Sequence, residues 1–311
     1  GGSSSGAGVA LASGQALGAL GTDTGGSIRL PAAYCGITGF MPSYGLVSRA
    51  GVFPLSATLD HVGPMARSVE DCAILLNALA GFDAADPGSV ERPATDYRAG
   101  LGDGVKGLRI GLAESLAQDK AVSAEGIAAY REAAATFRDL GAVVREVALP
   151  SFDDFAPARI VITIVEGYAL HERDLRTRRQ DYSYHSRMRL SLGPFIRAVD
   201  YARALRLREA LIARCTEIMR DVDVLLAPGA PGAAPKAASI EAFQFFKKPL
   251  VTMPANVLGV PALGMPAGMS KDGMPLAVQL MGRRFDDATV LRAGAAFQGA
   301  TAWHLARPPV G

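Results

Sequence analysis

Short apolar segments alternate along this chain with segments whose apolar residues recur at helical spacing. The clearest example is a strand over residues 108–112, then a helix that Ser123 caps and Gly141 ends, then a strand over 142–149. Other predicted elements are a helix capped by Ser68, long helices within 160–221, strands over 222–227, 262–265 and 276–281, and a closing helix over 287–299. Strands interleaved with helices favour an α/β fold. Because the 311 residues contain no internal repeat, we expect a single domain over residues 1–311.

The composition argues against several classes of function. Hydrophobic residues make up 49% of the chain and charged residues 20%, which is enough apolar material for a large core. The net charge of +2 gives no reason to expect nucleic acid or a membrane surface as a partner. Basic residues cluster between Arg173 and Arg208, but acidic residues interrupt them, which predicts a solvated, salt-bridged helix face. No apolar stretch is long enough to cross a membrane.

Cysteines and histidines are few and scattered. The three cysteines suggest neither a disulfide framework nor a metal-ligand pattern, which fits a cytoplasmic protein. The four histidines form no closely spaced pair, so we expect no metal centre. These residues are Cys35, Cys72 and Cys215, and His61, His171, His185 and His304.

A glycine-rich segment, Gly21 to Arg29, offers chemistry that can be argued from its residues. Residues 8–20 predict a helix, alone or followed by a strand, that runs into it. Two glycines precede Ser27, and they let the backbone turn sharply and bring several N–H groups toward one point. A hydroxyl beside converging N–H donors supplies what acyl transfer needs, a nucleophile and an oxyanion hole. The segment lacks the lysine of a phosphate-binding loop and the GxSxG pattern of an α/β-hydrolase.

A second segment, GGSSSG at residues 1–6, is ambiguous, since an engineered flexible linker has the same composition. The serine nucleophile also needs a base. His61 is the nearest histidine, and we expect it to be structural because nothing in the sequence places it beside Ser27. The alternative is a lysine kept neutral by burial, acting directly or through a second hydroxyl.

Three long segments resemble the amidase-signature family, whose members share a Ser–Ser–Lys triad. They are GGSSSGAGVALASGQALGALGTDTGGSIRLPAAYCGITGFMPSYGLVSRAG at residues 1–51, SATLDHVGPMARSVEDCAILLNALAG at 56–81, and GVPALGMPAGMSKDGMPLAVQLMGRRFDDATVLRAGAAF at 259–297. The resemblance implies an α/β fold with a large mixed, mostly parallel sheet that helices cover on both faces.

Carried over position by position, the resemblance implies that Ser27 is the nucleophile and that Ser3 bridges it to the base. The two serines are 24 positions apart, as in the family pattern, which Ser4 or Ser5 would not fit. In the family the bridging serine follows a cis peptide bond, which here would be formed with Gly2. The implied oxyanion hole consists of the backbone N–H groups of Thr24, Gly25, Gly26 and Ser27. Asp23 and Arg29 would support the turn from behind.

The third member of the triad, a lysine, lies several dozen residues before the bridging serine in the family. Only two residues precede Ser3 here, and all six lysines follow it: Lys106, Lys120, Lys236, Lys247, Lys248 and Lys271. We therefore expect the chain to be an N-terminally incomplete amidase-signature domain whose catalytic lysine is not among its 311 residues.

The implied activity is hydrolysis of a carboxylic amide to an acid and ammonia or an amine, through an acyl-enzyme on Ser27 and without metal or organic cofactor. The alternatives are the A-type subunit of a tRNA-dependent amidotransferase, and a non-catalytic relative without the lysine base. We expect a small amide as partner, no direct contact with nucleic acid or membrane, and a homodimer as one possible assembly. Phe53, Phe243, Phe245 and Phe246 are candidates for an acyl pocket, although we expect ordinary packing for each.

Overall fold

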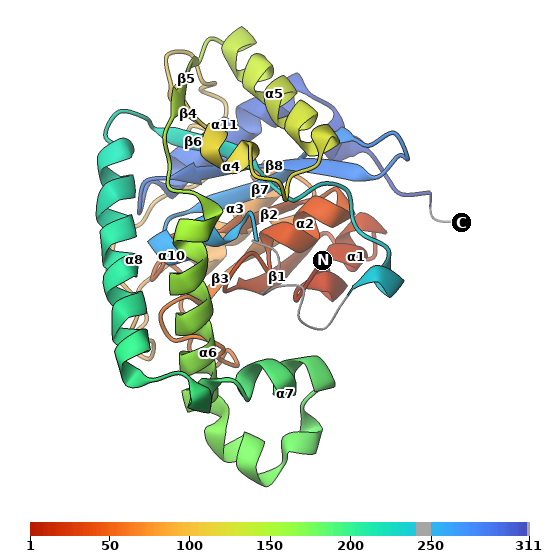
Figure 1. The fold of residues 1–311 in the computed structure, drawn as a ribbon. Helices are drawn as coiled ribbons and strands as arrows, with labels where there is room; N and C mark the ends of the chain where they lie inside the picture. Colours follow the sequence, from red (N-terminus) through yellow and green to blue (C-terminus); the bar gives the residue numbers. More distant parts are fainter. Residues whose placement is uncertain (241–249, 310–311) are drawn as a thin grey trace.

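One eight-stranded sheet forms the centre of the molecule (Figure 1). The computed structural model describes residues 1–240 and 250–309. The strands are β1 (Gly18–Asp23), β2 (Thr38–Met41), β3 (His61–Ala66), β4 (Arg109–Ala113), β5 (Val143–Val147), β6 (Val224–Pro228), β7 (Ala262–Met269) and β8 (Pro275–Gly282). Their order across the sheet is β1-β3-β2-β7-β8-β6-β4-β5. Strands from the two ends of the sequence therefore meet in the middle of the sheet.

Helices surround this sheet. They are α1 (Ser5–Ala12), α2 (Arg29–Cys35), α3 (Val69–Leu79), α4 (Glu114–Ala117), α5 (Ala124–Asp139), α6 (Phe152–Thr177), α7 (Tyr184–Leu190), α8 (Ala198–Ile218), α10 (Met253–Leu258) and α11 (Asp287–Ala300). Short 3₁₀ turns follow α6, α7 and α11, at Arg179–Asp181, Gly193–Phe195 and Trp303–Leu305, and another lies at Ala237–Ser239. The α/β class and the mixed sheet expected from the sequence are confirmed.

The expectation that the sheet is mostly parallel was wrong. Among the described strands, β4 pairs in parallel with β5 and with β6, whereas the five other neighbouring pairs are antiparallel. Parallel neighbours need a long crossover, such as the one that α5 provides between β4 and β5. β7 and β8 are instead joined by a short turn and pair as an antiparallel hairpin.

The β4–α5–β5 segment confirms the strand–helix–strand unit predicted from the sequence. α5 begins where Ser123 Oγ accepts a hydrogen bond from the N–H of Gly126. α3 begins in the same way, with Ser68 Oγ accepting from the N–H of Asp71. Each serine satisfies an N–H group that has no partner inside its own helix, which fixes where the helix starts.

Alternate residues of the central strands face two separate hydrophobic cores. Val224 and Leu226 of β6 pack on one face with residues of α3, α5 and α11. Leu225 and Ala227 pack on the other face with residues of α6, α8 and α10. Because successive side chains of a strand point to opposite faces, helices cover both faces of the sheet, as predicted.

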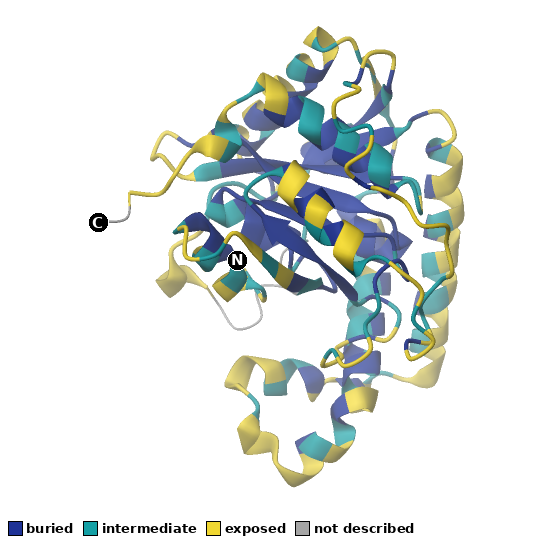
Figure 2. Ribbon diagram, turned by 180° about the vertical axis from the view of Figure 1, so that it is seen from behind, coloured by how far each residue is buried: buried dark blue, intermediate teal, exposed yellow. Residues whose placement is uncertain are grey.

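Helices α6, α7 and α8 form an arm whose end, around α7, lies beyond the sheet (Figure 1). α6 begins with a reciprocal capping pair, in which Ser151 Oγ accepts from the N–H of Asp154 and the Asp154 carboxylate accepts from the N–H of Ser151. Figure 2 shows buried residues where α6 meets the sheet and mostly exposed residues around α7. Within residues 1–240 and 250–309, no helix is both long and apolar enough to span a membrane.

The first thirty residues form α1, β1 and the start of α2. This confirms the helix-then-strand form of the prediction for residues 8–20. β2 and β3 were not predicted, because their sequences, TGFM and HVGPMA, are short and contain glycine or proline, which strands disfavour.

Candidate active site

The turn between β1 and α2 carries Ser27. Asp23, the last residue of β1, accepts hydrogen bonds from the backbone N–H groups of Gly26 at 2.6 Å, Ile28 at 3.1 Å and Arg29 at 3.4 Å. One carboxylate therefore fixes the path of the backbone on both sides of Ser27.

The side chain of Arg29 holds this carboxylate in place. Its Nη2 lies 3.0 Å from Asp23 Oδ1 and its Nε 3.1 Å from Oδ2, and neither side chain is exposed. The guanidinium also donates to Asn256 Oδ1 at 2.7 Å and to Gln279 Oε1 at 2.9 Å. Burial by itself would raise the pKa of Asp23. The charge and hydrogen bonds of Arg29, together with a hydrogen bond from Asn256, instead lower this pKa to about 2. Asp23 and Arg29 thus lie behind the turn, away from the pocket described below.

The turn leaves no room for a side chain at Gly26. Its φ angle is +127°, a conformation that residues with a β-carbon rarely adopt. An added β-carbon would also collide with the side chain of Thr252. Thr252 Oγ1 in turn donates to the carbonyl oxygen of Gly25 at 2.7 Å. The nucleophile turn is therefore packed directly against the start of α10.

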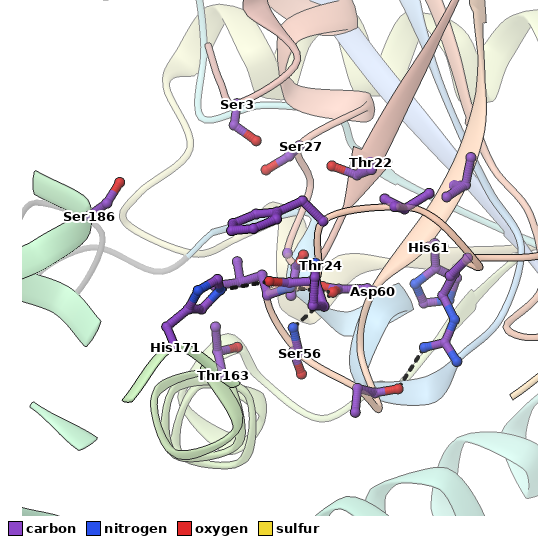
Figure 3. A pocket seen from close by; sticks show the side chains of 18 of the residues that line it. Ser3, Thr22, Thr24, Ser27, Ser56, Asp60, His61, Thr163, His171 and Ser186 are labelled. Atoms are coloured by element: carbon purple, nitrogen blue, oxygen red, sulfur yellow. Dashed lines mark hydrogen bonds between the residues drawn. The ribbon is translucent and has the colours of Figure 1, made fainter. Parts of the chain in front are cut away.

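Ser27 lines a pocket of about 780 Å³. Figure 3 shows the hydroxyl groups of Ser3 and Ser27 pointing toward each other at one side of it. The Gly2–Ser3 peptide bond is cis, as the resemblance implied. The N–H of Ser4 donates to the carbonyl oxygen of Ser27 at 3.2 Å, and Ser4 Oγ lies 3.3 Å from the N–H of Thr22. The GGSSSG segment is therefore folded against the turn and is not a free linker.

The four backbone amides expected to form an oxyanion hole differ in their contacts. The N–H of Gly26 donates to Asp23 at 2.6 Å, because the turn closes on that carboxylate, and its role as an oxyanion donor stays a prediction. The N–H groups of Thr24, Gly25 and Ser27 donate to no other group in the described part of the chain. All three residues line the pocket and remain candidate donors.

His61 begins β3, where the register of the sheet places it opposite Asp23. Its Nδ1 lies 2.7 Å from the carbonyl oxygen of Leu59, and its ring packs edge-on against Tyr44. Burial lowers the pKa of His61 to about 4, so the imidazole is neutral at neutral pH. Figure 3 shows the ring well apart from Ser27, in keeping with the structural role expected for it.

One wall of the pocket is the loop between β2 and β3. Asp60 organises it by accepting hydrogen bonds from Thr24 Oγ1 at 2.6 Å and from the N–H groups of Leu55 and Ser56 at 2.7 and 2.8 Å. Phe53 in the same loop lines the pocket and is 75% exposed. Phe243, Phe245 and Phe246 lie outside the described residues.

The arm supplies the opposite wall, with residues that sequence reasoning missed. Arg159, Thr163 and His171 of α6 and Arg189 of α7 line the pocket. No motif marks them, and Arg189 belongs to the basic segment that was interpreted as a solvated face. A basic residue on an otherwise amphipathic helix carries no sign of whether it faces water or a pocket.

Among the described residues, no group of three or more histidines, cysteines and acidic residues could hold a metal ion. The chemistry that the pocket offers includes two adjacent hydroxyls, three backbone N–H donors and the two arginines of the arm, Arg159 and Arg189.

Comparison with known proteins identifies the class to which this arrangement belongs. The Amidase family model matches residues 1–291, so the chain belongs to this family, the amidase-signature enzymes. It is 40% identical to an amidase of Pseudomonas putida, with 93% of this chain and 64% of the relative covered. It is 37% identical to the A subunit of the glutamyl-tRNA(Gln) amidotransferase of Chloroflexus aggregans, with 99% and 68% covered.

A solved structure with the same fold is the peptide amidase of Stenotrophomonas maltophilia. The TM-score is 0.83 and the identity 32%, with 99% of this chain and 66% of that chain covered. The chain thus spans about two thirds of the length of the relatives that it matches.

Proposed function

We propose that the protein is an amidohydrolase that forms an acyl-enzyme on Ser27. The observation that carries this proposal is the meeting of two hydroxyls, Ser27 on its glycine turn and Ser3 beside it, at one side of the pocket (Figure 3). A carboxylic amide is the substrate, and the products are a carboxylic acid and ammonia or an amine. The pocket of about 780 Å³ suits a small molecule.

The proposed reaction has two halves. Ser27 Oγ attacks the amide carbonyl carbon while its proton passes to Ser3 Oγ, whose own proton passes to a base. The tetrahedral intermediate then expels the amine, which receives a proton back through Ser3. Water attacks the acyl-Ser27 ester along the same proton path and releases the acid. These steps use only substrate, water, the two serines and a base, and they call for no metal or organic cofactor.

The base in this proposal is a neutral lysine, by analogy with the Ser–Ser–Lys triad that the chain resembles. Among the described residues that line the pocket there is no lysine, and His61 lies apart from Ser27. We therefore assign the lysine to the part of its relatives' length that this chain does not span.

The negative charge of the tetrahedral intermediate needs hydrogen-bond donors that are already in place. The N–H groups of Thr24, Gly25 and Ser27 are the proposed donors, each worth about 3 kcal/mol in comparable sites. The role of Asp23 and Arg29 is to hold the turn that presents them.

A second candidate function is that of the A-type component of an amidotransferase, favoured by the relative from Chloroflexus aggregans, which matches 99% of the chain. Partner chains that co-purify and hydrolysis of glutamine within that complex would favour it, whereas hydrolysis of simple amides by the isolated protein favours the first. The third possibility is a non-catalytic relative. A cytoplasmic location, supported by three free cysteines, and a homodimer stay predictions.

The first test asks whether Ser27 is the nucleophile. In the full-length protein, a fluorophosphonate probe should label wild type and fail to label Ser27→Ala. Ser3→Ala should lower kcat by orders of magnitude, while Ser5→Ala, a matched change at an exposed serine two residues away, should leave kcat unchanged. Equal labelling of wild type and Ser27→Ala would refute the assignment of Ser27, and equal kcat for the Ser3 and Ser5 variants would refute the bridging role.

A further inference from the structure

Arg159 is a charged pocket residue to which the proposed chemistry gives no role. It lies on α6 and lines the pocket. Its Nε is buried, and its guanidinium makes no hydrogen bond and no ion pair within residues 1–240 and 250–309. Figure 3 shows Thr163, one turn further along α6, on the same pocket wall. Leaving a cation partly buried without a partner costs folding free energy, so such a group is a candidate for a ligand contact.

The guanidinium of Arg159 lies directly over the nucleophile turn. A β-carbon built on Gly25 would be 2.9 Å from its Nη2 and 3.0 Å from its Nε, closer than two such atoms can pack. The bare Cα of Gly25 therefore makes the room that the guanidinium occupies. Gly25 precedes Ser27 by two residues, so their Cα atoms are at most about 7 Å apart. The positive charge is thus held beside the turn that carries the reacting serine.

The other charges of the pocket do not neutralise Arg159. Asp60 accepts its three hydrogen bonds from the loop and from Thr24, and Asp86 pairs with Arg49 at 2.8 Å. Asp23 is engaged by Arg29 behind the turn. Burial, together with the positive charge of Arg189, lowers the pKa of Arg159 to about 10, which still leaves it a cation at neutral pH. Arg159 therefore presents beside the nucleophile turn a positive charge that no acidic side chain of the described residues pairs with.

We propose that Arg159 binds a carboxylate of the substrate, so that the preferred substrates are half-amides of short dicarboxylic acids. This rests on the proposed function, since it places the amide of the same molecule at Ser27. The planar fork of a guanidinium matches a carboxylate with two parallel hydrogen bonds, which orients the substrate as well as attracting it. The short distance from Gly25 to Ser27 suits a carboxylate and an amide separated by about two to four carbon atoms.

Binding of an unreactive probe tests this proposal without relying on turnover. Titration calorimetry of the full-length protein with succinate and with glutarate should give Kd values about 100-fold higher for Arg159→Gln than for wild type. Arg159→Lys keeps the charge but loses the fork, and it should fall between the two. Arg206→Gln, which removes a positive charge from an exposed position of α8, should bind as wild type does. Equal Kd values for wild type and for a folded Arg159→Gln or Arg159→Lys variant would overturn the proposal.

Kinetics separate this proposal from the proposed function. Arg159→Gln should lower kcat/KM for succinamate about 100-fold and leave kcat/KM for the neutral butyramide within a few-fold of wild type. An equal loss on both amides would mean that Arg159 supports the turn and does not bind substrate. Hydrolysis of neither amide by wild type would count against the amidohydrolase, and the calorimetric result would still decide whether Arg159 binds a carboxylate.

Discussion

Asp23 and Arg29 form an ion pair with no exposed side-chain surface. Such a pair stabilises a fold only where further hydrogen bonds satisfy both partners. Here Asp23 also accepts from three backbone N–H groups and from Asn256, and Arg29 also reaches Gln279 and the carbonyl oxygen of Thr252. The pair therefore acts as the support on which the shape of the nucleophile turn depends.

Asp23→Asn should lower both stability and activity. The change removes the negative charge that Arg29 and the backbone N–H groups need, and breaking a buried ion pair typically costs about 3–5 kcal/mol. Urea unfolding should register that loss, and kcat should fall because the N–H groups of the turn are no longer held in place. Asp71→Asn, at an exposed carboxylate of α3, is the matched control and should cost about 1 kcal/mol or less. Similar free energies of unfolding for the two variants would contradict this account of the turn.

α6 is the element that connects the arm to the pocket. Arg159, Thr163 and Glu166 follow one another at helical spacing and so lie on one face of it. The carboxylate of Glu166 is buried and accepts from the hydroxyl of Ser56, from the N–H and Oγ1 of Thr58, and from the hydroxyl of Tyr201 on α8. One residue thus joins α6, α8 and the loop that forms a pocket wall.

Glu166→Gln should loosen that loop. The amide offers one acceptor oxygen where the carboxylate offers two, so several donors around it lose their partner, at about 1–3 kcal/mol in total. We expect a lower free energy of unfolding and a raised KM, because the loop between β2 and β3 lines the pocket. Glu172→Gln is the matched control. Glu172 lies on the same helix at a more exposed position, and its carboxylate pairs with Arg176. If both variants unfold at the same urea concentration and share the wild-type KM, Glu166 does not hold the loop.

For individual helices and turns, the sequence was informative where the structure depends on residues that are close together in the chain. Ser68 and Ser123 marked helix starts because a cap is a contact within four residues, and the Gly–Gly–Ser run of residues 25–27 marked a sharp turn for the same reason. Arg159 and Glu166 gave no signal, since Arg159 contacts Gly25 and Glu166 contacts Ser56, each more than 100 positions away in the sequence. The resemblance implied that Asp23 supports the turn, but the sequence did not show which N–H groups its carboxylate accepts, among them that of Gly26.

Across the whole molecule, two buried groups give opposite dependences of stability on pH. Burial lowers the pKa of His61 from 6.5 to about 4, so its contribution to stability is complete above pH 6.5 and is lost as the pH falls toward 4. Burial raises the pKa of Asp287 from 3.8 to about 6, although Ser43 donates to it, so its contribution is complete below pH 3.8 and is lost as the pH rises toward 6. The two slopes oppose each other between pH 4 and 6.

We propose that residues 1–311 respond as one domain, since a single sheet links β1 to β5.

Replacing either residue should reveal how the other makes the free energy of unfolding depend on pH. In Asp287→Asn, the free energy of unfolding should rise between pH 4 and 6 more steeply than in wild type, by about 1 kcal/mol per pH unit. In His61→Gln, the free energy of unfolding should decrease, relative to wild type, as the pH rises from 4 to 6, again by about 1 kcal/mol per pH unit. Urea unfolding at pH 4.5, 5.5 and 6.5 gives these slopes. Parallel profiles for all three proteins would mean that neither group has the shifted pKa described above.

The hydrogen bonds from Arg29 to Thr252, Asn256 and Gln279 also have a consequence for synthesis of the protein. A ribosome makes the nucleophile turn more than 200 residues before it makes these three partners of Arg29. The turn can therefore take its final shape only after β8 has been made and paired, late in folding. A nascent chain thus carries Ser27 for most of its synthesis without a finished site around it.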